Sequence, residues 1–488
     1  MGRHIQQNSA ISSIVEAIAR HADSMPDKLA LRIGKEACTY GELWALILKS
    51  RNKTRSFAKS SVVILSAEKS ITFIAHYFAS HLNGLICILT EPKLSITAIE
   101  NIACQYNAQA YLSNKGEVNN ICNIRYNLAD DDSTELPVEF PTRDCIADYM
   151  FTTGTTGESK CVPLSHGNLL ASAGNINTFI GNTHDDNELI ALPLCHSFGL
   201  GRVRCALLAG GACTIIPNFA NEKKLLATIS EEGITGFSMV PAAWQYIRHL
   251  CAERFFTAAR HLHFIEIGSA PLSLDDKEFL SSNLPDTRIC MHYGLTEASR
   301  SAFMEFHADA DKLSSSGKAT PGVDISIYSA EGIQLAANQP GEICVRGKHV
   351  TNGYLNYPHD DSFYGEYFRT GDMGMLDSDG TLFILGRIKE LINVGGKKVS
   401  PDEVESKVIQ YPGIKECACT AANDPTGILG EVVKAHIVPL ADNQIDIPDL
   451  LHFLRGLLEP HKIPRVVEIC NTPLPRTESG KLQRQKLL

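Results

Sequence analysis

The segment from Phe151 to Lys160, FTTGTTGESK, brings hydroxyl side chains, glycines and one cation together. Hydroxyls and backbone N–H groups beside glycine can surround an anion without steric conflict, and Lys160 adds positive charge. A Walker A loop needs glycine directly before Lys-Ser/Thr, but Glu158 and Ser159 separate Gly157 from Lys160. The segment therefore predicts a polyphosphate-binding loop of another kind, with a plain Gly-Thr surface turn as the alternative.

Four further segments follow this loop in order: YGLTE at 293–297, YFRTGD at 367–372, GRIKE at 386–390 and PRTESGK at 475–481. Together with residues 152–160 they resemble the ordered motifs of the adenylate-forming superfamily. That superfamily contains acyl- and aryl-CoA synthetases, nonribosomal adenylation domains and luciferases. The resemblance covers most of the chain from residue 152 onward, and the pattern is most similar to the activators of acyl and aryl acids. One departure is Cys161, which stands where the family's loop usually has glycine.

The resemblance implies that ATP binds between the loop and the later motifs. The loop residues implied to surround the phosphates are Thr152, Thr153, Gly154, Thr155, Thr156, Gly157 and Lys160. The later residues, implied to contact adenine, ribose and the α-phosphate, are Gly268, Ser269, Ala270, Pro271, Tyr293, Gly294, Thr296, Asp372 and Arg387. Glu297 is implied as the Mg²⁺ ligand, which suits a hard cation that prefers carboxylate oxygen.

Lys481 is implied as the catalytic cation of adenylation, acting with Thr296, Glu297 and His196. When a carboxylate attacks the α-phosphate, negative charge grows on the phosphate oxygens, and an ammonium group there stabilises the transition state more than the ground state. The alternative for Lys481 is a solvated lysine near a chain terminus.

The resemblance also implies parts for the thioester-forming step. Lys389 would be the hinge between adenylation and thioester formation, and Gly395 and Gly396 would leave backbone room for a pantetheine arm.

The segment from Pro193 to Leu200, PLCHSFGL, resembles the histidine-containing segment of fatty and aryl acid activators. No acidic residue lies between Glu188 and Glu222 to offset a buried substrate ammonium, which disfavours amino acid substrates. The candidate pocket residues are His196, Phe198, Met239, Val240 and Ile267, with Ala302 and Phe303 as further candidate walls; a plain core role is the alternative for each. Arg202 and Arg204 follow this segment, facing either a polar group of the substrate or the acidic surface.

Two acyl acceptors remain open. The main hypothesis is an ATP-dependent ligase that forms an acyl-adenylate from a fatty, aryl or related acid and passes the acyl group to the thiol of CoA. The alternative acceptor is the phosphopantetheine thiol of a separate acyl carrier protein. A nucleotide-binding regulator without turnover would be expected to lack Lys160, Glu297, Asp372 or Lys481, and all four are present.

Composition excludes several other classes. A net charge of -10 argues against a nucleic-acid binder, which needs a basic face. No run approaches about 20 apolar residues and no signal peptide is evident, so we expect a cytoplasmic enzyme that does not bind a membrane. The 15 cysteines lack zinc spacing and are expected to be mostly buried, with Cys417 and Cys419 on one face of a strand.

The elements that must position these residues alternate along the chain. Apolar runs predict strands at 61–66, 85–89, 188–194, 213–217, 237–241 and 262–268, and amphipathic spacing predicts helices at 11–22 and 221–232. Strands alternating with helices predict an α/β fold with largely parallel sheets. Residues 129–144 are acidic and contain proline, which predicts a surface loop.

The pattern changes after about residue 315, where short strands are broken by Gly and Asp turns such as Ser378-Asp379-Gly380. A compact α+β pattern starts after Gly386, with helices expected at 400–410 and 447–458 and strands at 415–420 and 432–438. With the resemblance, this predicts a large domain over 1–387, made of mainly parallel sheets flanked by helices plus a small β-barrel-like subdomain. A small, mobile α+β domain is expected over 388–488.

Overall fold

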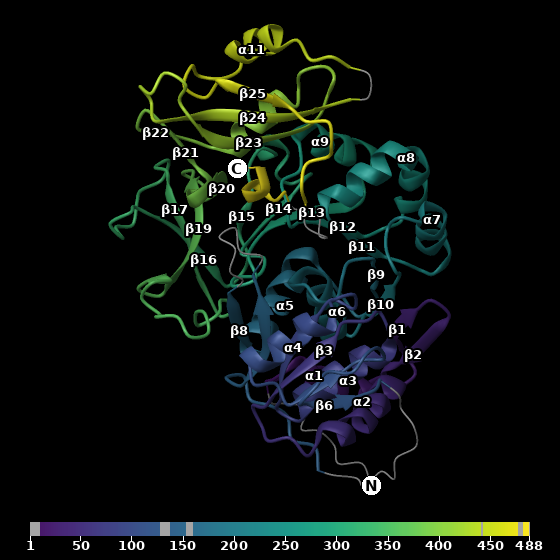
Figure 1. Ribbon diagram of the computed structural model, residues 1–488. Coiled ribbons are helices and arrows are strands. Elements are labelled where there is room, and N and C mark those ends of the chain that lie inside the picture. Colours follow the sequence, from purple (N-terminus) through teal and green to yellow (C-terminus); the bar gives the residue numbers. More distant parts are fainter. Residues whose placement is uncertain (1–9, 127–136, 153–159, 441–442, 477–481, 488) are drawn as a thin grey trace.

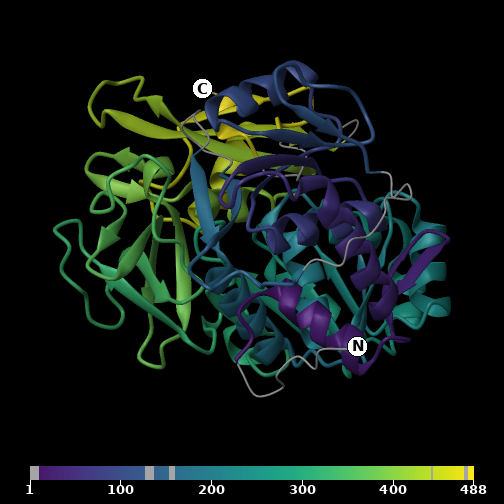
Figure 2. The same cartoon turned by 90° about the horizontal axis from the view of Figure 1, so that it is seen from below.

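The computed structural model describes residues 10–126, 137–152, 160–440, 443–476 and 482–487. Figure 1 shows the N-terminal sheets and helices in the lower part, a green antiparallel sheet to one side and the C-terminal unit at the top. Figure 2 shows the same regions from below, where the antiparallel sheet stands apart from the helices that surround the larger sheets. The α/β prediction is confirmed.

The largest sheet has nine strands in the order β15-β14-β13-β12-β11-β9-β10-β1-β2. Its six central strands are parallel, and β2, β14 and β15 are antiparallel strands at its two edges. The strands span Leu29–Ile33 (β1), Glu36–Thr39 (β2), Asn187–Ile190 (β9), Ala212–Ile215 (β10), Gly236–Met239 (β11), Phe264–Ile267 (β12), Arg288–Tyr293 (β13), Ala302–Glu305 (β14) and Lys318–Ala319 (β15).

A second sheet has six strands in the order β6-β5-β3-β4-β7-β8, of which only β8 is antiparallel to its neighbour. The strands span Val62–Ser66 (β3), Ile86–Thr90 (β4), Ala110–Leu112 (β5), Cys122–Ile124 (β6), Ile146–Phe151 (β7) and Cys161–Ser165 (β8). Strands β3 and β4 are buried along their whole length, as is typical of parallel strands covered on both faces.

Three smaller sheets follow. The five-stranded antiparallel sheet contains Val323–Tyr328 (β16), Gly341–Gly347 (β17), Phe363–Tyr364 (β18), Tyr367–Leu376 (β19) and Leu382–Arg387 (β20). The C-terminal unit contains a hairpin of Ile392–Val394 (β21) and Lys397–Val399 (β22), and a sheet of Ile414–Asn423 (β23), Glu431–Pro439 (β24) and Val466–Ile469 (β25). The turn predicted at 378–380 lies between β19 and β20 and is closed by Asp377 and Thr381.

The α-helices among the described residues are Ile14–Ser24 (α1), Tyr40–Thr54 (α2), Ile71–Leu82 (α3), Ile96–Gln105 (α4), His166–Ile180 (α5), Ser197–Ala209 (α6), Glu222–Glu231 (α7), Pro241–Ala259 (α8), Leu274–Asn283 (α9), Pro401–Val408 (α10) and Ile447–Arg455 (α11). Most of them begin after a Ser, Thr, Asn or Asp whose side chain accepts a hydrogen bond from the first turn, as Ser400 does from Glu403. None of the described helices is long and apolar enough to cross a membrane.

Element boundaries differ from the predictions by a few residues. The strand expected at 237–241 ends at Met239, because Val240 is the N-cap of α8 and Pro241 begins that helix. The helix expected at 400–410 ends at Val408. Cys419 is buried in the C-terminal core and Cys417 packs against it, as expected. Part of the predicted loop at 129–144 lies outside the described residues.

Helix α6 lies between the two large sheets and is bonded to both. Arg202 is completely buried and pairs with Glu188 on β9, 2.6 Å away, and with Glu266 on β12, 3.2 Å away. Arg204, also buried, pairs with Asp148 on β7 of the second sheet. Of the two alternatives that the sequence left open, a polar group of the substrate or the acidic surface, the acidic surface is wrong, because both arginines pair with buried carboxylates. Removing Arg202 would leave the buried Glu188 without its cationic partner, at a cost of about 3–5 kcal/mol.

Candidate active site

Tyr293, Asp372 and Arg387 meet where the nine-stranded sheet adjoins the five-stranded antiparallel sheet. Tyr293 is the last residue of β13, and its hydroxyl donates a 2.6 Å hydrogen bond to Oδ2 of Asp372. Asp372 and Arg387 are directly opposite each other on β19 and β20, and Nε of Arg387 lies 2.8 Å from Oδ1 of Asp372. Residues from distant parts of the sequence thus form one hydrogen-bonded group.

This group is held in fixed charge states. Burial raises the pKa of Tyr293, and the neighbouring Asp372 raises it further, so the phenol stays protonated as a donor. Burial alone would lower the pKa of Arg387, but Asp372, Tyr293 and Glu297 outweigh it and raise that pKa. The pairing also orients the guanidinium, whose Nη1 donates to the carbonyl oxygen of Thr370.

Lys160 and Glu297 approach each other around Tyr354. Nζ of Lys160 lies 4.3 Å from the centre of the Tyr354 ring and 4.8 Å from that of Tyr357, which are distances for cation–π contacts. The Tyr354 hydroxyl donates to Oε1 of the buried Glu297 carboxylate, and burial together with Glu297 raises the pKa of this phenol. A cation and a carboxylate of the predicted site are therefore linked by one aromatic side chain.

The ends of the predicted phosphate loop are clamped by a hairpin. Strands β7 and β8 pair with Phe151 opposite Cys161, and beyond them Thr152 N donates to the carbonyl oxygen of Lys160. Lys160 N in turn donates to Oγ1 of Thr152, 3.2 Å away. The predicted phosphate contacts of Thr153, Gly154, Thr155, Thr156 and Gly157 lie outside the described residues. Cys161 is a buried strand residue, and burial raises the pKa of its thiol to about 12.

Two glycines of the predicted nucleotide site are sterically required. A Cβ added at Gly268 would lie 2.0 Å from Cε1 of His292, and one at Gly294 would lie 2.3 Å from the backbone nitrogen of Arg300. Ser269, next to Gly268, has a φ of 76°, a left-handed conformation that is uncommon outside glycine. Ser269, Ala270 and Pro271 form an exposed segment after β12, where an adenine could reach them.

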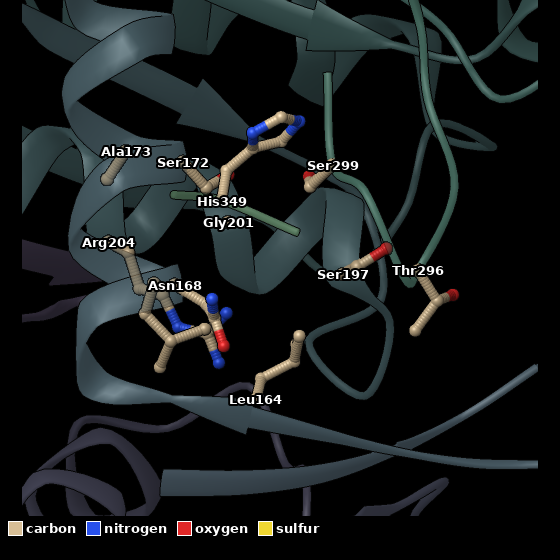
Figure 3. Close-up of a pocket in the computed structure, with 11 residues that line it drawn as sticks. Leu164, Asn168, Ser172, Ala173, Ser197, Gly201, Arg204, Thr296, Ser299 and His349 are labelled. Carbon is tan, nitrogen blue, oxygen red and sulfur yellow. The ribbon is translucent and has the colours of Figure 1, made fainter. Parts of the chain in front are cut away.

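Thr296 borders a small cavity (Figure 3). The cavity volume is about 20 Å³ for water-sized molecules, enough for a single water. Its polar lining comes from Asn168, Ser172, Ser197, Arg204, Thr296, Ser299 and His349. The cavity is therefore too small for a substrate, and it connects Thr296 to the buried side of α6.

The predicted acyl-pocket residues separate into an accessible and a buried group. His196, the N-cap of α6, keeps 39% of its side chain exposed, and its Nε2 lies 3.5 Å from Oε1 of Glu91. Phe198 is buried, Val240 is half-buried, and Met239 and Ile267 are fully buried in a hydrophobic core. That burial fits the core role that the sequence left open for Met239 and Ile267.

The C-terminal unit carries the remaining predicted residues. Lys389 is exposed in the short 3₁₀ helix Ile388–Glu390 (η2). Gly395 and Gly396, with φ of 56° and 87°, form the exposed turn between β21 and β22. Lys481 lies outside the described residues.

Several residues of this region were not anticipated from the sequence. Tyr354 follows no periodic pattern that would single it out, and His292 precedes a recognised motif without belonging to it. Arg484, in the 3₁₀ helix Arg484–Leu487 (η3), binds Glu390, Asp402 and Glu405. An arginine in a C-terminal segment gives no local sign of partners about 80 residues away.

Comparison with known families agrees with this geometry. The family model described as AMP-binding enzyme matches residues 18–355, and the model described as AMP-binding enzyme C-terminal domain matches residues 403–481. The chain belongs to the AMP-binding enzyme family. It is an acid–thiol ligase of the AMP-forming type within the adenylate-forming superfamily, as the motifs predicted.

Individual relatives of this AMP-binding enzyme cover much of its length. Feruloyl-CoA synthase from Amycolatopsis sp is 28% identical to this chain, in an alignment that covers 95% of this chain and 96% of the synthase. The 2-succinylbenzoate–CoA ligase of Staphylococcus aureus strain JH9 is 33% identical over 77% of this chain and 75% of its own.

Solved structures show the same fold. ATP-bound MatB from Rhodopseudomonas palustris has a TM-score of 0.88 at 26% identity, covering 98% of both chains. The o-succinylbenzoate CoA synthetase MenE from Bacillus subtilis, in complex with its acyl-adenylate intermediate, has a TM-score of 0.86 at 26% identity, covering 96% of this chain and 97% of its own.

Proposed function

We propose that this enzyme activates a carboxylic acid with ATP and transfers the acyl group to CoA. A carboxylate oxygen of the acid attacks the α-phosphorus, and the bond from that phosphorus to the bridging oxygen breaks, releasing pyrophosphate. The CoA thiol then loses its proton and attacks the acyl carbon, and AMP leaves with the electron pair of the acyl–phosphate bond. The products are an acyl-CoA, AMP and pyrophosphate.

The observation that carries the proposal is the convergence of Lys160, Tyr293, Glu297, Asp372 and Arg387 on one region. Hydroxyl, carboxylate and guanidinium groups there match the chemistry of a nucleotide. Asp372 accepts a hydrogen bond from Tyr293 and pairs with Arg387, and a carboxylate is the kind of acceptor that ribose hydroxyls bond. Tyr293 offers an aromatic ring to the purine, and Lys160 a point charge to the phosphates.

Glu297 fits the proposed role of Mg²⁺ ligand. Its carboxylate is buried, accepts a hydrogen bond from Tyr354 and lies near two cations, Lys160 and Arg387. A bound Mg²⁺ would neutralise charge on the phosphates of ATP. Glu297 would hold this ion while Tyr354 keeps the carboxylate oriented.

The remaining roles are proposed from the family resemblance. Lys481 supplies positive charge to the α-phosphate during adenylation, with Thr296 as a neighbouring hydrogen-bond donor. Lys389 is the hinge of the unit that begins at about residue 388, and Gly395 and Gly396 line the path of the thiol arm. His196, exposed at the start of α6, gates the acid site. A cytoplasmic location also remains a prediction.

CoA is favoured over a carrier protein as the acceptor. The names of feruloyl-CoA synthase and 2-succinylbenzoate–CoA ligase both give CoA as the acceptor. The alignment with feruloyl-CoA synthase covers 95% of this chain. A carrier protein would deliver the same phosphopantetheine thiol, so the two acceptors differ in the surface that they contact rather than in the chemistry.

One assay separates these acceptors. The enzyme is incubated with ATP, Mg²⁺ and single acids from a panel of fatty, aryl and hydroxy acids, and pyrophosphate release is measured. The active acid is then tested with CoA or with a holo-carrier protein, and AMP and thioester are quantified. We expect CoA-dependent AMP release; thioester formation with the holo-carrier alone would favour the carrier, and no acid-dependent pyrophosphate release would overturn the proposal.

A further inference from the structure

Potential metal ligands from the two large sheets meet just before helix α6. Glu91 directly follows strand β4 of the six-stranded sheet, whereas Cys195 and His196 end the connection from β9 of the nine-stranded sheet to α6. A carboxylate oxygen, the Sγ atom and an imidazole nitrogen of these residues all lie within 4.8 Å of one another. Sequence spacing does not reveal this cluster, because Glu91 is far from Cys195 and His196 along the chain.

The spacing of the ligand atoms suits a tetrahedral metal ion. Nε2 of His196 lies 3.5 Å from Oε1 of Glu91, which is longer than a normal N–H···O hydrogen bond. Zinc binds imidazole nitrogen and carboxylate oxygen at about 2.0–2.2 Å, so neighbouring ligands of a tetrahedral ion are about 3.3–3.6 Å apart. An ion between these two side chains would therefore require little movement of either.

The three side chains differ in their exposure to solvent. Glu91 and His196 keep 32% and 39% of their side chains exposed, whereas Cys195 is buried. An ion arriving from solvent would thus meet the carboxylate and the imidazole first, with the sulfur at the base of the site. Three protein ligands and one position for water are typical of accessible zinc sites, in contrast to closed structural sites with four protein ligands.

Lys69 fixes the loop that carries Cys195. Its Nζ donates to the carbonyl oxygens of Ala191, Ile216 and Pro217, at 2.6, 2.9 and 2.8 Å, so main-chain oxygens occupy the three donors of the ammonium group. Burial lowers the pKa of Lys69 to about 8 against an opposing effect of Cys195, so most of this group is charged at neutral pH. A neighbouring ammonium favours the thiolate of a cysteine, which is the form that binds metal ions.

Two other groups of potential metal ligands occur among the described residues: His81, Cys87 and Asp148, and His436, Glu468 and Cys470. Each of them already contains a cation of the protein. In the first group the guanidinium of Arg204 pairs with Asp148, and in the second Nζ of Lys434 lies 2.7 Å from Oε2 of Glu468. A metal ion would have to displace these cations, which disfavours both groups.

We propose that Glu91, Cys195 and His196 bind a thiophilic divalent cation, with Zn²⁺ as the representative ion, and that the bound ion inhibits acid activation. Thiolate and imidazole ligands select ions of the zinc type, whereas Mg²⁺ prefers oxygen ligands, so this site is distinct from the proposed Mg²⁺ site at Glu297. The ion would link the end of β4 to the start of α6 and hold the His196 side chain in place. The inhibition rests on the proposed function, whereas the binding of the ion does not.

Metal binding is measured first, on the whole enzyme after dialysis against a chelator. Co²⁺ is the coloured probe, because a thiolate ligand gives it a charge-transfer band in the near ultraviolet. Cys195→Ser should abolish this band. Isothermal titration with Zn²⁺ should show that Cys195→Ser and Glu91→Gln each bind the ion at least about 10- to 100-fold more weakly, a loss that is typical even for residues that only support a metal ligand.

The second cluster of the same ligand types provides the control. Cys470→Ser should leave the Co²⁺ band and the Zn²⁺ affinity unchanged, because Lys434 already neutralises the carboxylate of that cluster. Thermal unfolding establishes that each variant is folded. If Cys195→Ser and Glu91→Gln keep the full affinity and the band, the ion binds elsewhere and the inference is overturned.

Activity measurements then test the inhibition. In the pyrophosphate assay with saturating ATP and Mg²⁺, buffered free Zn²⁺ should abolish acid-dependent release by the unaltered enzyme, and a zinc-selective chelator should restore it. Cys195→Ser and Glu91→Gln should each retain their metal-free activity when Zn²⁺ is added. The affinity for ATP should not change, because the ion lies at the proposed entrance for the acid.

The outcomes are distinguishable. Binding of Zn²⁺ at these residues without inhibition would overturn the proposed closure of the entrance. If no acid causes pyrophosphate release even from the metal-free enzyme, the proposed function fails and the inhibition fails with it, while the Co²⁺ spectrum and the Zn²⁺ titration still decide whether the metal site exists.

Discussion

The nucleotide region and the C-terminal unit hold their functional side chains in different ways. Tyr293, Asp372 and Arg387 lie on or at the ends of strands and bond to one another. Lys389 and Gly396, by contrast, are exposed in a 3₁₀ turn and a hairpin turn. The first region is preformed, whereas the second keeps its residues available to solvent.

The end of the chain is attached within the C-terminal unit. Arg484 attaches the end of the chain to Glu390, Asp402 and Glu405 by ion pairs, and Leu482 and Leu487 of the same segment pack against an apolar cluster. The comparison teaches that the nucleotide region supplies fixed geometry, and we propose that the C-terminal unit supplies movement.

The largest expected effect comes from removing the proposed mobile cation. Lys481→Ala should lower the rate of acid-dependent pyrophosphate release by about 10²–10³-fold, because charge on the α-phosphate loses its stabilisation in the transition state. Thioester formation from preformed acyl-adenylate should be nearly unchanged. Lys486→Ala, a lysine of the same tail within η3, is the control. Unimpaired pyrophosphate release by Lys481→Ala would remove the mechanism.

A change in the preformed region should act on nucleotide binding instead. Asp372→Ala leaves Arg387 and the Tyr293 hydroxyl without their shared acceptor, and we expect ATP to bind about 10- to 100-fold more weakly. Isothermal titration with ATP and Mg²⁺ measures this. Asp377→Ala alters the turn between β19 and β20, where Asp377 pairs with Lys312, and should bind ATP normally. Equal affinities in the two variants would contradict the placement of the ribose.

The hinge gives a smaller and more selective effect. Lys389→Pro fixes φ at this position, so we expect thioester formation to fall about 10-fold while adenylation is retained. Lys389→Ala, which keeps backbone freedom, should behave like the unaltered enzyme in both half-reactions. A parallel loss of both half-reactions in the proline variant would indicate a folding defect and not a hinge.

The smallest effect is a pH dependence of stability in the C-terminal unit. Burial raises the pKa of Glu405 from 4.5 to about 7, with Asp402 adding to the effect and Arg484 opposing it. The folded state then holds a proton that the unfolded state has lost between these values, so the free energy of unfolding should fall as pH rises from about 5 to 7. Thermal unfolding at several pH values should show a decline of a few degrees.

Substitution isolates this group. Glu405→Gln cannot titrate, so its melting temperature should decline less over the same pH range. Glu403 lies on the same helix and pairs with Lys462, so Glu403→Gln is the matched control. It should retain the full dependence, and identical pH profiles for the two variants would contradict the assignment.

Much of the fold was predictable because strand burial and motif order are local properties. The apolar run at 61–66 gave β3, and the Ser400-Pro401 pair gave the start of α10 within one residue. The partners of Arg202 were not predictable, because Glu188 and Glu266 come next to it only when β9, β12 and α6 assemble. For the same reason the role of Tyr354, which contacts both Lys160 and Glu297, could not be predicted from the sequence.

The two-sided attachment of α6 limits how the proposed entrance to the acid site can respond to a ligand. Arg202 is paired with the nine-stranded sheet and Arg204 with the six-stranded sheet. Helix α6 therefore cannot move relative to either sheet without breaking a buried ion pair. Any swing of His196 must therefore be absorbed by the few backbone torsions between β9 and the first turn of α6. The gating that we propose for His196 is therefore a local movement of one loop, and its rate should not depend on the position of the C-terminal unit.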